Sequence, residues 1–129
     1  MRENLFRGKR IDTGAWVQGY YFKTWDEHYI CWGTTNGEVD KLLVIPETVG
    51  QYTGLDDKNG VEIFDGDVLR DDESIVIVKF VDGGFSVDYR TIGGKWRNYS
   101  DLFDYLDDYE GEVVGNIHDN PELAEKLFG

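Results

Sequence analysis

Short segments that alternate apolar and polar residues, and that end near glycines, constrain this chain more than any other feature of its sequence. Residues 85–90 (FSVDYR) alternate with period two and follow the turn-forming Asp82-Gly83-Gly84. This period is that of a strand with one buried face, and glycine supplies the positive φ angles of tight turns. Sixteen glycines and two prolines divide the whole chain into such segments. The sequence therefore predicts a mainly β fold.

The predicted strands are short and rich in β-branched and aromatic residues, which suit a pleated sheet. They cover residues 16–22, 29–32, 42–45, 67–70, 75–81, 85–90 and 112–118. Segment 75–81 (IVIVKFV) is almost continuously apolar, so we expect a central strand covered on both faces. One short helix is expected after Ser100, where Asp101 and Asp104 suit the positive N-terminal end, and a second at Pro121.

The length of 129 residues fits one ordinary domain, or one domain with a smaller appended unit. No low-complexity linker or internal repeat separates two halves, so any border must be compact. Pro46 begins a new connection, which favours a border near residues 42–48. We therefore divide the chain into an N-terminal β region, residues 1–45, and a C-terminal region, residues 46–129.

The charge of the chain is strongly negative and unevenly distributed. The formal net charge is −13; residues 1–25 carry five basic and two acidic groups, whereas residues 98–129 carry one basic and nine acidic groups. Nucleic-acid affinity depends largely on Lys and Arg, which displace counterions from phosphates. This charge therefore disfavours direct binding of DNA or RNA.

The sequence indicates a cytoplasmic protein. No apolar run approaches the roughly 20 residues of a membrane-spanning helix, and the first residues lack the apolar stretch of a secretory signal. The single cysteine, Cys31, lies among Tyr29, Ile30 and Trp32. We interpret it as a small buried residue rather than a reactive thiol.

Several motifs invite a catalytic or metal-binding interpretation, but each has a simpler structural one. Asp65 and Asp67 could hold Mg²⁺ or Ca²⁺, yet aspartates around a glycine are typical of a turn before a strand. His28 and His118 have no further Cys or His pair to complete a zinc site, and no serine lies in a G-x-S-x-G elbow. We assign no catalytic residue, no metal ligand and no cofactor.

Aromatic side chains are the first candidates for an interaction surface. Trp16, Tyr20 and Phe22 share one face of an alternating segment, and Tyr21 lies on the other face. A small domain lacks the interior for all of these rings, so some of them would form a binding surface. The open alternative is that a second sheet or a partner subunit of a homo-oligomer covers one face.

An acidic run is the second candidate. It consists of Asp101, Asp104, Asp107 and Asp108. Solvated surface is the favoured interpretation, because acidic residues are costly to bury and loops accept them freely. The alternative is that the carboxylates imitate the phosphates of nucleic acid, or bind cations.

Four stretches carry a resemblance that covers nearly the whole chain. They are residues 6–10 with 14–21, residues 48–69, residues 78–85 and residues 112–123. Together and in this order they resemble the YopX family of phage and prophage proteins. The resemblance implies a small SH3-like barrel in the C-terminal part, an N-terminal β extension and one or two short helices. It brings no catalytic or ligand motif to any residue of this chain.

These observations favour a phage or prophage accessory protein in the bacterial host cytoplasm, which acts through protein-protein contact and without enzymatic activity. One alternative is an acidic nucleic-acid mimic that modulates host DNA-acting proteins. The other is a metal-dependent enzyme built on the acidic loops.

Overall fold

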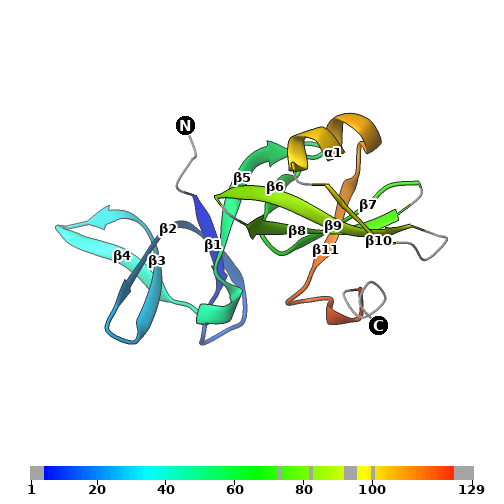
Figure 1. The fold of residues 1–129 in the computed structure, drawn as a ribbon. Coiled ribbons are helices and arrows are strands. Elements are labelled where there is room, and N and C mark those ends of the chain that lie inside the picture. The colour runs from blue at the N-terminus through cyan, green and yellow to red at the C-terminus, as the bar shows by residue number, and fades with distance from the viewer. Residues whose placement is uncertain (1–4, 73, 82, 92–95, 100, 124–129) are drawn as a thin grey trace. The chain divides into compact units, whose positions relative to one another are not determined.

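The chain forms two compact units, seen in a computed structural model that describes residues 5–72, 74–81, 83–91, 96–99 and 101–123 (Figure 1). The first unit ends at Tyr52 and the second starts at Thr53. Eleven strands dominate the described residues, so the predicted mainly β fold is confirmed. The division into residues 1–45 and 46–129 stays a prediction.

The first unit is an antiparallel sheet in which the strands follow the order β4-β3-β2-β1-β5. Its elements are β1 (Phe6–Lys9), β2 (Trp16–Thr24), β3 (Glu27–Thr35), β4 (Glu38–Leu43), the 3-10 turn η1 (Pro46–Thr48) and β5 (Gly50–Asp56). The last strand extends beyond the unit, where it pairs with β6 (Glu62–Phe64).

Strand β2 changes its pairing partner halfway along its length. Residues 16–19 pair with β1, and residues 20–24 pair with β3. Gly19 lies at the change, where an added Cβ would stand 2.2 Å from the carbonyl oxygen of Cys31 and 3.1 Å from the Ile30 side chain. Only glycine permits this close approach of the two backbones.

The end of β4 is tied to the end of β1. Arg10 and Val44 form an antiparallel bridge, and the amide of Ile45 donates to the carbonyl of Lys9 at 2.8 Å. Val44 is completely buried and contacts Gly8, where a Cβ would lie 3.1 Å from its side chain. The two strand ends are therefore joined by both hydrogen bonds and packing.

The second unit contains a five-stranded antiparallel sheet of order β10-β9-β8-β7-β11. Its elements are β7 (Asp67–Arg70), β8 (Ser74–Val81), β9 (Gly84–Thr91), β10 (Trp96–Tyr99), the helix α1 (Leu102–Tyr109) and β11 (Glu112–Asn116). The helix packs against β9 and β10 (Figure 1). Leu102 and Tyr105 of the helix pack into a core of buried strand residues, which are Ile63, Leu69, Val76, Val78 and Val87.

Strand β8 is the central strand of this sheet, as its apolar sequence predicts. Val76 and Val78 belong to the core under α1, while Ile77 packs with Val68 in a second cluster. Burial on both faces is thus confirmed for the middle of the strand. The prediction of burial on both faces is wrong at the C-terminal end of β8, because Phe80 and Val81 are about half exposed.

The hairpin, the helix after Ser100 and the start of the terminal helix follow the sequence prediction. Strands β8 and β9 pair around Gly83, whose φ is 82°. Residues 121–123 are helical, and the remainder of the predicted terminal helix lies outside the described residues. The SH3-like barrel expected in residues 46–129 is not confirmed, because the sheet of order β10 to β11 does not close in the described residues.

Candidate functional site

One face of the sheet in the first unit gathers aromatic and basic side chains. Residues directly opposite one another in neighbouring strands project to the same face. The register therefore unites four such pairs: Lys9 with Trp16, Phe22 with Tyr29, Tyr20 with Cys31, and Cys31 with Lys41. The alternation predicted for Trp16, Tyr20 and Phe22 agrees with this register.

Cations lie over the rings at both ends of this surface. The guanidinium of Arg7 lies 4.5 Å from the centre of the Trp16 ring, and the Lys9 ammonium lies 5.5 Å from it. At the other end, the Lys41 ammonium lies 5.6 Å from the Tyr29 ring. Such contacts contribute about 0.5–1 kcal/mol each at exposed positions. We call this surface the ring face; it consists of Trp16, Tyr20, Phe22 and Tyr29 with Arg7, Lys9 and Lys41.

The rings differ in how much they are available to a partner. Phe22 and Tyr29 stack on each other with centroids 5.0 Å apart and an interplanar angle of 16°. Trp16 is half-buried, whereas 61% of Tyr20 is exposed. The Tyr29 hydroxyl donates to Glu27 at 3.0 Å, and this hydrogen bond raises the pKa of Tyr29. Tyr20 is therefore the most accessible ring of the surface.

Tyr21 lies on the opposite face and does not join this surface. Its hydroxyl is 2.6 Å from Nδ1 of His28, and the two rings stack with centroids 5.8 Å apart. Phe6 lies on its other side, with centroids 5.5 Å apart. The same face carries the fully buried Ile30. This position makes Tyr21 part of the packing within the first unit.

Helix α1 carries the acidic candidates, and its sequence separates two faces. At about 100° per residue, Phe103, Asp104, Asp107 and Asp108 fall on one side and Leu102, Tyr105, Leu106 and Tyr109 on the other. The first group is exposed, including 61% of Phe103, and Leu102 and Tyr105 are buried. We call the exposed group, Phe103 with Asp104, Asp107 and Asp108, the helix face.

The four acidic candidates have different relations to the helix. Asp101 is the N-cap, and its carboxylate accepts a hydrogen bond of 2.8 Å from the Phe103 amide. Asp104 lies in the first turn, where a negative charge is favourable. Asp107 and Asp108 lie in the last turn, which holds no basic residue and where a negative charge opposes the helix dipole. The N-cap and the helix dipole thus account for the positions of Asp101 and Asp104, but the dipole does not account for those of Asp107 and Asp108.

The Asp65-Gly66-Asp67 motif forms a turn between β6 and β7. Gly66 has a φ of 91°, and the buried Asp67 accepts a hydrogen bond of 2.8 Å from the Phe64 amide. The backbone of Gly66 also bonds to Val78 and to Ile117. Within the described residues, no three His, Cys, Asp or Glu side chains are grouped so that they could hold a metal ion.

A second buried aspartate, Asp57, is a structural residue that sequence reasoning did not single out. Its carboxylate accepts hydrogen bonds from the amides of Asn59 and Val61 through Oδ1, and from the amide of Val113 through Oδ2, at 2.8–2.9 Å. It therefore fixes its own turn and attaches that turn to β11. The signal in the sequence is an aspartate three residues before a turn glycine, Gly60.

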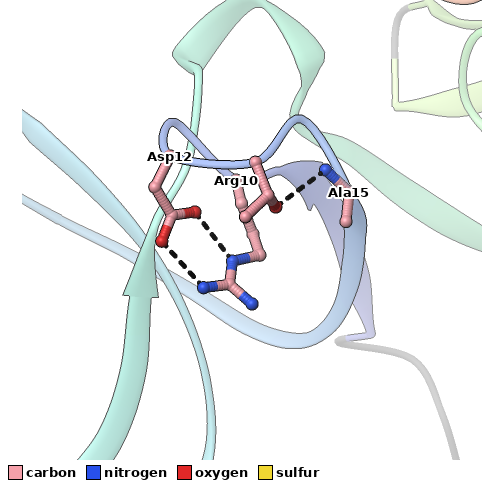
Figure 2. A network of polar contacts seen from close by, with 4 residues as sticks. Arg10, Asp12 and Ala15 are labelled. Carbon is pink, nitrogen blue, oxygen red and sulfur yellow. Dashed lines mark hydrogen bonds and ion pairs between the residues drawn. The ribbon is translucent and has the colours of Figure 1, made fainter.

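The basic segment 7–10 is engaged in contacts within the first unit. Arg7 and Lys9 lie over Trp16, while Arg10 makes a two-point ion pair with Asp12 at 2.8 and 2.9 Å (Figure 2). The hydrogen bond from Arg10 lowers the pKa of Asp12. Figure 2 also shows the Ala15 amide in the same exposed loop between β1 and β2.

The fold and the surfaces define a mainly β protein of two units, with a cation-lined ring face on the first and an acidic helix face on the second. None of the helices in the described part of the chain combines the length and hydrophobicity that crossing a bilayer requires. The family model described as YopX protein matches residues 5–125, so the chain belongs to the YopX family. No curated protein matches the sequence.

Proposed function

We propose that this YopX-family protein is a non-enzymatic protein-protein interaction module, encoded by a phage or prophage and acting in the cytoplasm of the bacterial host. The ring face is its principal contact surface. The observation that carries this proposal is that Tyr20 is exposed on a face whose other rings contact cations. Arg7 lies over Trp16, and Lys41 lies over Tyr29.

Such a surface has the chemistry of an interface centre. Tyr, Trp and Arg are enriched among the residues that dominate binding energy, because they bury a large area and still satisfy polar atoms. Arg7 and Lys9 are already positioned by Trp16, and Lys41 by Tyr29. Side chains that are ordered before binding lose less conformational entropy when a partner arrives.

The SH3-like barrel expected in residues 46–129 remains a proposal, and the strand order of residues 6–56 supports a similar architecture in the first unit. Five antiparallel strands in the order β4-β3-β2-β1-β5, with a 3-10 turn before the last strand, follow the strand order of small SH3-like barrels. The hydrogen bonds that return the end of β4 to β1 support the same interpretation.

A capture experiment with the full chain tests the proposal. Tyr20→Ser should lose a protein that the unchanged chain retains from the lysate of a bacterium with a YopX-family prophage. Trp25→Ser is the matched control, because Trp25 is fully exposed in the turn between β2 and β3 and lies outside the ring face. Identical retained proteins for all three chains, with unchanged folding by circular dichroism, would contradict the proposal.

A second candidate function, nucleic-acid mimicry, is favoured by one observation. The charges of Asp107 and Asp108 oppose the dipole of α1, so the dipole does not account for their position. An acidic surface of this kind suits the DNA-binding face of a host protein. In that case duplex DNA should displace the captured protein, and an Asp107→Asn/Asp108→Asn chain should fail to capture it.

A further inference from the structure

The ring face and the helix face carry charges of opposite sign, and each has one exposed ring. The ring face combines the exposed Tyr20 with the cations Arg7, Lys9 and Lys41. The helix face combines the exposed Phe103 with carboxylates. Each surface offers an exposed ring on a face whose charges have the sign opposite to those of the other face.

Charge is divided between the two units in the same sense. Residues 1–52 carry six basic and seven acidic groups, whereas residues 53–129 carry seven basic and nineteen acidic groups. The basic groups of the ring face therefore lie in the nearly neutral unit, and the helix face lies in the unit with nearly all of the excess negative charge. Repulsion between the first unit of one copy and the second unit of another copy is therefore weaker than the net charge of −13 suggests.

The unfavourable charges on α1 also point to a cationic occupant. Asp104 and Asp107 are three residues apart, a spacing at which like charges repel, and Asp107 in the last turn also opposes the helix dipole. Ammonium and guanidinium groups placed beside these carboxylates would relieve both effects. The ring face supplies such groups together with a ring that can pack against Phe103.

We infer that the ring face of one copy binds the helix face of a second copy, so that this chain associates head to tail. The inference rests on the proposed function, because it names the partner of the same ring face. The two surfaces differ, so the contact is heterologous, and an open assembly leaves a ring face free at one end and a helix face free at the other. Growth then continues to a closed ring or an open filament.

Sedimentation of the full chain at low salt over about a hundredfold range of concentration tests this inference. Mass should rise with concentration and fall when salt is added. A ring variant, Tyr20→Ser/Lys41→Glu, and a helix variant, Asp104→Lys/Asp107→Lys, should each weaken association at least about tenfold. The control Trp25→Ser should associate like the unchanged chain. Circular dichroism should show the same strand content for all of them.

Mixing the two variants gives the decisive result. The ring variant retains its helix face and the helix variant retains its ring face, so the mixture should form a one-to-one dimer that does not grow further. A monomer at every concentration would overturn the inference, as would a mixture that stays monomeric or a helix variant that associates normally. If the chain is monomeric but Tyr20→Ser still loses a captured protein, the proposed function stands and only the self-association fails.

Discussion

The hydroxyl of Tyr105 donates a hydrogen bond of 2.6 Å to the carboxylate of Asp71, across 34 residues of sequence. Tyr105 is fully buried on α1, and Asp71 lies in the turn between β7 and β8. The same carboxylate accepts hydrogen bonds from the amide and the hydroxyl of Ser74. A Cβ on Gly111 would lie 2.5 Å from the Tyr105 hydroxyl, so glycine is needed beside it. This contact attaches the helix to the sheet below it.

Removal of this hydroxyl should destabilise the second unit. A hydrogen bond to a charged group contributes about 1.5–3 kcal/mol, so Tyr105→Phe should lower the free energy of unfolding by about that amount in urea denaturation. Tyr29→Phe removes an exposed hydroxyl that also donates to a carboxylate, and it should change stability by less than about 0.5 kcal/mol. Equal effects of the two substitutions would contradict a structural role for the Tyr105 contact.

Alkaline pH should weaken the same unit. Burial and then the hydrogen bond to Asp71 raise the pKa of Tyr105 above its ordinary value. The folded state therefore retains the proton at pH values where the unfolded state releases it, and stability should fall as pH rises above about 10. The difference in melting temperature between the unchanged chain and Tyr105→Phe should shrink over this range. A difference that is constant up to pH 11.5, at about the upper limit of reversible melting, would show that Tyr105 does not titrate differently in the two states.

Asp57 should be more sensitive than any exposed aspartate. Asp57→Asn places an amide group where Oδ2 now accepts the Val113 hydrogen bond, or else where Oδ1 accepts from Asn59 and Val61. One backbone donor loses its partner in the first orientation and two in the second, so we expect a loss of about 2–3 kcal/mol in urea denaturation. Asp72→Asn is the control at an exposed position and should stay within about 0.5 kcal/mol.

Gly19 and Gly33 should respond differently to the same substitution. Gly19→Ala brings a Cβ to 2.2 Å from the Cys31 carbonyl oxygen, which is a backbone atom that cannot rotate away. We expect a loss of at least about 2 kcal/mol, measured by thermal melting. A Cβ on Gly33, in β3, meets nothing within 4 Å, and Gly33→Ala should leave the melting temperature nearly unchanged.

The position of each charge along α1 should determine the sign of its effect on stability. Asp107→Lys places a positive charge in the last turn and should stabilise the protein by about 0.3–1 kcal/mol, whereas Asp104→Lys in the first turn should destabilise it by a similar amount. Urea denaturation of the two variants at low salt measures both. The prediction fails if the two substitutions change stability in the same direction.

Sequence reasoning could reach the class of fold and most of the strands, because period-two alternation and turn glycines act locally. It also placed Asp101 at the N-terminal end of α1, where the structure shows its carboxylate bonded to an amide only two residues away. It missed β1 (Phe6–Lys9), which is short and has two basic residues, because its position depends on pairing with both β2 and β5. A segment of four residues carries too little information to predict its partner strands.

The candidate surface was predictable only in part, for the same reason. Alternation along one strand placed Trp16, Tyr20 and Phe22 on one face. The rest of the ring face comes from β1, β3 and β4, and the register that brings Lys41 over Tyr29 includes an irregularity between Cys31 and Gly33. No single segment contains that information. The buried role of Asp57 was likewise hidden, because one of its partners is 56 residues away.

The exchange of partners along β2 has a consequence for evolution within this surface. Trp16 precedes the exchange and Tyr20 follows it, so the relative orientation of these two rings depends on Gly19 between them. A position without any side chain thus controls the angle at which a partner would meet the aromatic side chains. Because only glycine fits at this position, the fold holds that angle constant while the ring residues themselves are free to vary.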